Sequence, residues 1–192
     1  MESKFFTFIK PYISYIDNGE IYRRPFSWVY MILAVLNLIL PIYIFVKAVD
    51  TGVFDGPAKF VIVFILIWLI MAFAGWISFQ LWWDRRTKIL GTSQKDDDFV
   101  ATPVFSHFIQ TFGEWFGTWI GIVGFGFALI STIFLGESGG SVLSNRIGVG
   151  ILESGILAII LMPIYGFLII VVTRFLAEQF RALSSIANNT KK

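Results

Sequence analysis

The chain has 192 residues, of which 56% are hydrophobic and only 15% are charged, and its mean hydropathy is +0.75. A soluble domain of this size needs more polar surface, so the composition excludes an ordinary soluble protein and predicts an integral membrane protein. The net charge of +2 is too small to indicate a nucleic-acid partner, and the lack of cysteine excludes disulfides, thiolate metal sites and cysteine nucleophiles.

The first 27 residues are amphipathic, and we expect them to lie along the membrane interface. Aromatic and aliphatic residues dominate the segment, but Lys10, Pro11 and Arg23 interrupt it. We therefore expect no cleavable signal peptide, which needs an unbroken apolar region before a small-residue cleavage site. This segment precedes a predicted transmembrane domain over residues 28–173, and a cytoplasmic helix and tail over residues 174–192.

Four apolar stretches are long enough to cross a bilayer, whose hydrocarbon core of about 30 Å needs roughly 20 residues per helix. They are Trp28–Val46, Ala58–Trp83, Trp115–Leu135 and Ile147–Val172. The predicted fold is therefore all-α. It is a polytopic membrane protein with four transmembrane helices, amphipathic interfacial segments and a cytoplasmic C-terminal helix.

Twelve of the 15 Lys and Arg residues lie in the N-terminal segment, the second loop and the C-terminal segment. Only Lys47, Lys59 and Arg146 lie in the other two loops. Because Lys and Arg are enriched in cytoplasmic loops, this bias places both termini and the second loop in the cytoplasm. We expect a multi-pass membrane protein that is surrounded by membrane lipids.

Proline residues predict kinks in the first and fourth spans. Pro41 leaves the carbonyl of Asn37 without its helical partner, and Pro163 interrupts the fourth span in the same way. Asn37 and Pro41 are consistent with a hinge or part of a permeation path. We favour an ordinary kink whose polar groups are satisfied by neighbouring helices.

The second loop contains the acidic run Lys95-Asp96-Asp97-Asp98. Its spacing lacks the alternation and glycine of a calcium loop, so we interpret it as a solvated segment. Thr102 and Pro103 then resemble an N-cap and the first position of a helix. We expect this helix to lie along the interface as far as Gln110 and then to turn into the third span.

The third span carries small residues on one face, namely Gly113, Gly117, Gly121 and Gly124, with Ala128 on the same face. Small residues let helix backbones approach closely in lipid, so this glycine face predicts a packing surface. Its partner is a helix of the same chain or of a second copy, and we favour the same chain. The fourth span offers a candidate partner face, made of Gly150, Ser154 and Ala158.

The C-terminal segment is predicted to be a helix from Arg174 to about Ala187. Arg174 and Arg181 have helical spacing with Glu178, which predicts ion pairs that orient the tail. Apolar residues form a stripe on the same helix: Phe175, Leu176, Phe180, Leu183 and Ile186. This stripe must contact the membrane surface, the protein's own loops or a partner, and we assign Phe175, Phe180 and Leu183 to partner contacts.

No catalytic motif in the sequence meets its structural requirements. Gly136-Glu137-Ser138-Gly139-Gly140 matches the G-x-S-x-G pattern, but it follows a membrane helix in what we expect to be an external loop. His107, the sole histidine, is predicted on the opposite side and cannot act as its base. Glu114 lies at the cytoplasmic start of the third span and could pair with Arg174, but we favour an interfacial acid beside water. We therefore predict neither an enzyme nor a cofactor or metal site.

The segment from Arg174 through Glu178 and Arg181 to Asn188 resembles the C-terminal part of small bacterial inner-membrane proteins that carry a domain of unknown function. In those proteins the last span runs into an Arg–Glu–Arg helix that ends near an Asn. The resemblance covers mainly the C-terminal quarter, and the aromatic first half resembles Bacteroidetes-type proteins. It implies no activity and no functional residues.

Together these features predict a non-enzymatic structural or accessory subunit of a larger inner-membrane complex, with other integral membrane subunits as partners. The alternative is a homo-oligomeric channel or transporter for a small solute or ion. In that case Asn37, Thr118 and Ser131 would face a shared aqueous path, although no span has the polar stripe that a water-filled pore needs.

Overall fold

The computed structural model describes residues 8–92 and 101–190, and all regular structure in these ranges is helical. The elements in chain order are α2 (Lys10–Asp17), α3 (Glu20–Asp50), α4 (Ala58–Ile89), α5 (Ala101–Trp119), the π-helical turn η1 (Ile120–Gly124), α6 (Phe125–Ile147) and α7 (Ile156–Thr190). The acidic run Lys95–Asp98 lies outside the described residues.

Four helical stretches are apolar enough to span a membrane, and they are 31 to 36 residues long. At a rise of 1.5 Å per residue they measure about 46–54 Å, which exceeds the hydrocarbon thickness of about 30 Å. This confirms the predicted all-α fold of a polytopic membrane protein with four transmembrane helices. The helices also extend beyond the hydrocarbon, so each contributes an interfacial portion.

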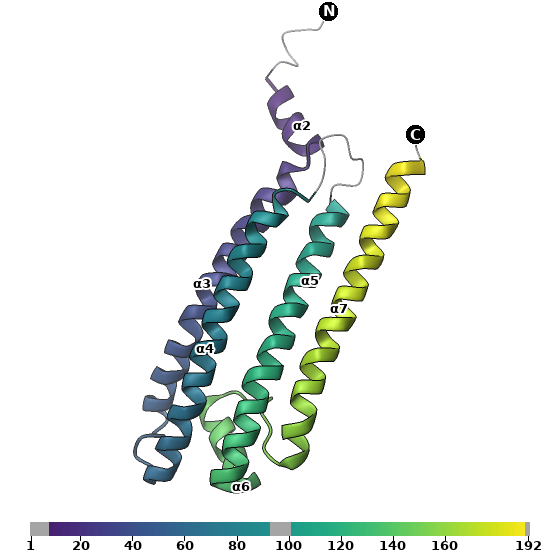
Figure 1. Ribbon diagram of the computed structural model, residues 1–192. Coiled ribbons are helices and arrows are strands. Elements are labelled where there is room, and N and C mark those ends of the chain that lie inside the picture. Colours follow the sequence, from purple (N-terminus) through teal and green to yellow (C-terminus); the bar gives the residue numbers. More distant parts are fainter. Residues whose placement is uncertain (1–7, 93–100, 191–192) are drawn as a thin grey trace, which may run out of the picture.

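The long helices form two antiparallel pairs, α3 with α4 and α5 with α7 (Figure 1). The N-terminal and C-terminal ends lie at one end of the bundle, and the α3–α4 turn and α6 lie at the other. Among the described residues, α7 contacts α5, η1 and α6 but neither α3 nor α4. Helix α7 is therefore an edge helix that is covered on one side.

Several helix boundaries differ from the predicted spans. Helix α3 begins at Glu20, where an ion pair of 2.8 Å links Glu20 to Arg24 in the first two turns. It continues without interruption through Pro41, and α7 continues through Pro163. The predicted domain boundaries after residues 27 and 173 thus fall inside α3 and α7. The expected turn at Gln110 is wrong, since α5 is one helix from Ala101.

The third span changes its helical geometry twice. It passes through the π-helical turn η1 and reaches Gly136, whose positive φ of 72° breaks the helix. Glycine adopts this left-handed conformation without the steric penalty of a Cβ. The chain then continues as a second helical segment to Ile147, in the region that we expected to be an external loop.

The predicted start of the fourth span at Ile147 is wrong. Ile147 ends α6, a non-helical connection follows, and α7 begins at Ile156. Gly139 and Gly140 gave this segment the composition of a loop. In the structure they permit close packing, since a Cβ added to Gly140 would lie 2.5 Å from Cβ of Ser154.

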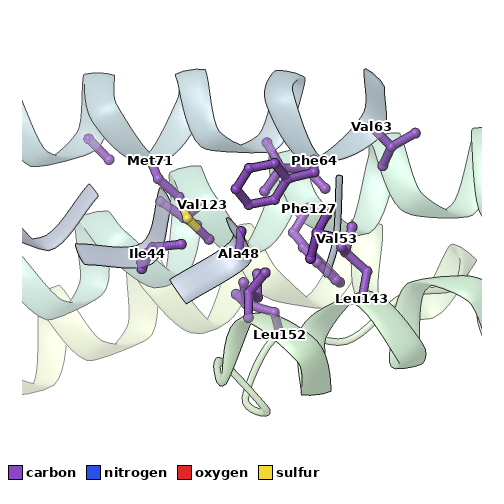
Figure 2. Packing of buried hydrophobic residues seen from close by; sticks show 13 residues of the cluster. Ile44, Ala48, Val53, Val63, Phe64, Met71, Val123, Phe127, Leu143 and Leu152 are labelled. Atoms are coloured by element: carbon purple, nitrogen blue, oxygen red, sulfur yellow. The ribbon is translucent and has the colours of Figure 1, made fainter. Parts of the chain in front are cut away.

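The hydrophobic core consists of two clusters of buried side chains. The larger one lies towards α6 and the α3–α4 turn, and Figure 2 shows how Leu143 and Leu152 pack near Ala48 and Val53. The smaller one lies nearer the termini: Tyr30, Ala34, Trp82, Ile89 and Val104. The segment after Gly136 therefore completes the core at the end of the bundle opposite the termini.

Candidate functional site

Polar side chains gather along α5, in the half of the bundle that contains the termini. Helix α5 is central, because it contacts α3, α4 and α7. Its polar residues therefore meet groups from three neighbouring helices. We take this buried polar cluster, which is centred on Glu114, as the candidate functional site.

Glu114 connects α5 to α4 through Arg85. The arginine donates to Oε2 of Glu114 from both Nε (3.1 Å) and Nη2 (2.9 Å), and Nε2 of Gln110 donates to Oε1 at 2.7 Å. The Arg85 and Glu114 side chains are 24% and 12% exposed, so solvent screens the pair only partly. Charge-assisted hydrogen bonds of this kind are stronger than neutral ones.

The same network extends to α7. Nη2 of Arg181 donates to Oε1 of Gln110 at 2.9 Å, and the hydroxyl of Ser106 donates to the carbonyl of Ala177 at 2.6 Å. A continuous hydrogen-bonded path from Arg85 through Glu114 and Gln110 to Arg181 thus joins α4, α5 and α7. This path links α4 to α7, which make no direct contact in the described residues.

A second polar group joins α3 to α5. The hydroxyl of the fully buried Tyr30 lies 2.9 Å from Nδ1 of His107 and 3.3 Å from the hydroxyl of Thr111. Thr111 in turn donates to the carbonyl of His107. The Tyr30 ring packs edge-on against Trp82 of α4, with 5.0 Å between the ring centroids. His107 therefore makes a structural contact between helices.

Asn37 forms the third polar group, deeper in the bundle. Its Oδ1 accepts hydrogen bonds from Nε1 of Trp115 (2.7 Å) and Nε1 of Trp119 (3.2 Å), while its Nδ2 donates to the carbonyl of Leu33. Only 4% of Asn37 is exposed. The oxygen and the nitrogen of this amide thus both hydrogen-bond to the protein itself, as a buried polar group in a membrane requires.

The backbone of α3 around Pro41 packs closely against α4. A Cβ added to Gly75 of α4 would lie 2.5 Å from the carbonyl oxygen of Asn37, the group that Pro41 deprives of its helical donor. The carbonyl of Pro41 itself accepts a 2.9 Å hydrogen bond from Nε1 of Trp68. Asn37 and Pro41 therefore lie at the junction of α3, α4 and α5.

The glycine face of α5 lies against α7 of the same chain. Gly113 meets Thr173, Gly117 meets Gly166 and Ile170, Gly121 meets Gly166, and Gly124 meets Met162. A Cβ on Gly117 would lie 2.5 Å from the carbonyl oxygen of Gly166, so the two backbones are in direct contact. The α5–α7 contact is therefore built on glycine.

The partner face predicted for these glycines is wrong. Gly150 lies in the connection before α7, and Ser154 packs against Gly140. Ala158 is buried near the start of α7. The residues that meet the glycine face lie further along the chain, because the fourth helix starts nine residues later than expected and its register against α5 shifts accordingly.

The predicted ion pairs of the tail are found in part. Arg174 pairs with Glu178 at 3.2 Å, where both side chains are more than half exposed. Arg181 instead donates to Gln110 and to the carbonyl of Ala177. The Glu114 carboxylate neither pairs with Arg174 nor stands alone beside water, because it binds Arg85 and Gln110. Phe175, Phe180 and Leu183 are 58%, 39% and 63% exposed.

Sequence reasoning did not find the roles of Arg85, Gln110 or Tyr30. A signal was available for Gln110 and Glu114, since their spacing of four residues places them on one helix face. Among the described residues, no group of three His, Asp or Glu side chains could hold a metal ion.

Comparisons with protein-family models, with curated proteins and with solved structures find no match to this chain. The geometry of the chain itself must therefore support any functional conclusion.

Proposed function

We propose that this protein is a non-enzymatic structural or accessory subunit of a larger complex in the bacterial inner membrane, and that α7 binds a neighbouring subunit. Both termini lie in the cytoplasm in this proposal, as the distribution of Lys and Arg favours. The supporting observation is an apolar stripe that continues along α7 beyond the length of a membrane span.

The length of α7 defines the part of the stripe that lipid tails do not cover. Helix α7 has 35 residues and measures about 52 Å, whereas a span needs roughly 20 residues. Counted from Ile156, the far edge of the hydrocarbon falls near Phe175. Leu183 and Ile186 lie beyond that edge and are 63% and 59% exposed. Apolar side chains exposed at this position favour a protein partner.

The buried polar groups also favour a subunit over a channel. Asn37 is bound to two tryptophans, Thr118 donates to the carbonyl of Glu114 at 2.6 Å, and Ser131 donates to the carbonyl of Phe127 at 2.6 Å. The three residues expected to line an aqueous path therefore direct their hydrogen bonds to their own chain. The hydrogen bonds of Asn37 with the two tryptophans also join α3 to α5.

The test is the mass and composition of the native complex, extracted in mild detergent or nanodiscs. We expect other integral membrane chains at a fixed ratio. The triple variant Phe180→Ala, Leu183→Ala, Ile186→Ala should release them. A matched control removes three apolar side chains of α3 that are also exposed, by 48–55%: Ile32→Ala, Ile39→Ala and Val46→Ala. A homo-oligomer without other chains would instead support the channel, and a monomer unaffected by either variant would contradict the proposal.

A further inference from the structure

An open groove runs along α7 on the side that also borders α5 and η1. Its volume is about 610 Å³, and Phe116 of α5 and Ile120 of η1 form part of its wall. The wall along α7 extends from Gly155, just before the helix begins, to Ile169. Most of the side chains on this wall are apolar, including Ala158 and Leu161.

The dimensions of the groove favour a single acyl chain. The stretch from Gly155 to Ile169 is about 21 Å long at 1.5 Å per residue. This exceeds the roughly 15 Å depth of one leaflet of the hydrocarbon, so a chain entering from the interface stays within apolar surroundings. A volume of 610 Å³ over that length gives a mean cross-section of a few tens of Å². A helix about 10 Å in diameter has a cross-section of about 80 Å², so it could lie only partly within the groove.

The end of the groove opposite the termini is polar and negatively charged. Glu153 and Ser154 line it immediately before α7 begins. Glu153 is exposed, and it makes no ion pair or hydrogen bond within the ranges that the structure describes. An unpaired carboxylate at the mouth of an apolar groove complements a cationic headgroup above an acyl chain.

We propose that this groove binds an aminophospholipid, with one acyl chain along α7 and the ammonium of the headgroup at Glu153. A phosphatidylethanolamine has this combination of an ammonium and long acyl chains, whereas a phosphatidylglycerol of the same chains lacks the ammonium. The site lies at the opposite end of α7 from Leu183 and Ile186, so it does not depend on the subunit proposal above.

The experiment measures lipid binding to the purified, delipidated full-length chain by native mass spectrometry. Dioleoyl phosphatidylethanolamine and dioleoyl phosphatidylglycerol are titrated in parallel. We expect the wild type to prefer the ethanolamine lipid. Glu153→Gln should reduce its affinity roughly two- to five-fold, as for loss of an exposed ion pair, and should not weaken binding of the anionic glycerol lipid. Asp50→Asn is the control, because it removes another exposed acid at the same end of the bundle.

Ala158→Phe tests the apolar part of the site by filling the groove. It should weaken the binding of both lipids. Glu153→Gln changes only the headgroup preference, so it still tests the proposal if Ala158→Phe disturbs folding. Equal binding of the two lipids by the wild type, or an unchanged preference in Glu153→Gln, would overturn the proposal. So would a dimer or a bound partner helix that is lost with Ala158→Phe, because the occupant would then be a protein.

Discussion

Gly117 and Gly166 face one another across the α5–α7 interface, and a Cβ on either residue would lie 2.5 Å from the carbonyl oxygen of the other. The relationship is reciprocal and involves backbone atoms, which cannot move aside as a flexible side chain can. Two residues that lie 49 positions apart in the chain therefore bring their helices as close together as glycine allows. Helix association in lipid depends on this kind of packing.

Gly117→Ala should destabilise the protein by about 1–3 kcal/mol, the usual effect of excess volume in a packed interface. Gly150→Ala is the matched control, because the nearest atom to its added Cβ is the side-chain oxygen of Asn145 at 4.0 Å. Thermal unfolding in detergent measures both. Equal stability of the two variants would show that α5 and α7 do not pack through Gly117.

Asn37→Leu should cost about 1–3 kcal/mol, because it leaves the indole N–H groups of Trp115 and Trp119 buried without an acceptor. Thr118→Val is the control, since its hydroxyl bonds only to a carbonyl of its own helix. Urea unfolding followed by tryptophan fluorescence measures the difference. An Asn37→Leu variant as stable as Thr118→Val would contradict the assigned contacts.

Glu114→Ala should be more damaging than Glu178→Ala. The first change leaves Arg85 half-buried without its carboxylate and removes the acceptor of Gln110, for which we expect a loss of about 1.5–3 kcal/mol. The second removes an ion pair that is more than half exposed, with an expected effect of about 0–1 kcal/mol. The ranking is read from melting temperatures at one pH. If the tail pair rather than the central network holds α7 in place, Glu178→Ala will lower the melting temperature more than Glu114→Ala.

Tyr30→Phe isolates the hydroxyl group that joins α3 to His107 and Thr111. The ring contact with Trp82 persists, so we expect a loss of about 1 kcal/mol. Tyr43→Phe serves as the control on the same helix, because Tyr43 is 58% exposed. Equal melting temperatures of the two variants would show that the hydroxyl of Tyr30 does not stabilise the polar cluster.

The four spans could be predicted from the sequence because a long apolar run has few alternatives to a membrane helix. The contacts of individual residues could not, since each depends on register. A single period of 3.6 residues per turn cannot describe the third span, since the π-helical turn adds one residue and shifts the residues after it by about 100° relative to a continuous α-helix.

The candidate site could be predicted only in its parts. Glu114 was recognised as an interfacial acid, but Arg85 and Arg174 were both available to it, and only the packing of α4 on α5 decides between them. The helix after Gly136 was missed because Gly139 and Gly140 weaken helix propensity, while tertiary packing of Leu143 and Ile147 outweighs that cost.

The π-helical turn also determines which changes of length the third span can accept. Deleting one residue between Ile120 and Gly124 would restore a regular α-helix and shorten the span by only about 1.5 Å. The same deletion would rotate α6 relative to α5, so Gly126 could no longer face Ile70 of α4 while Gly117 faces α7. The span would thus still be long enough to cross the bilayer after the loss of one residue. It would no longer pack against α4 and α7 at the same time.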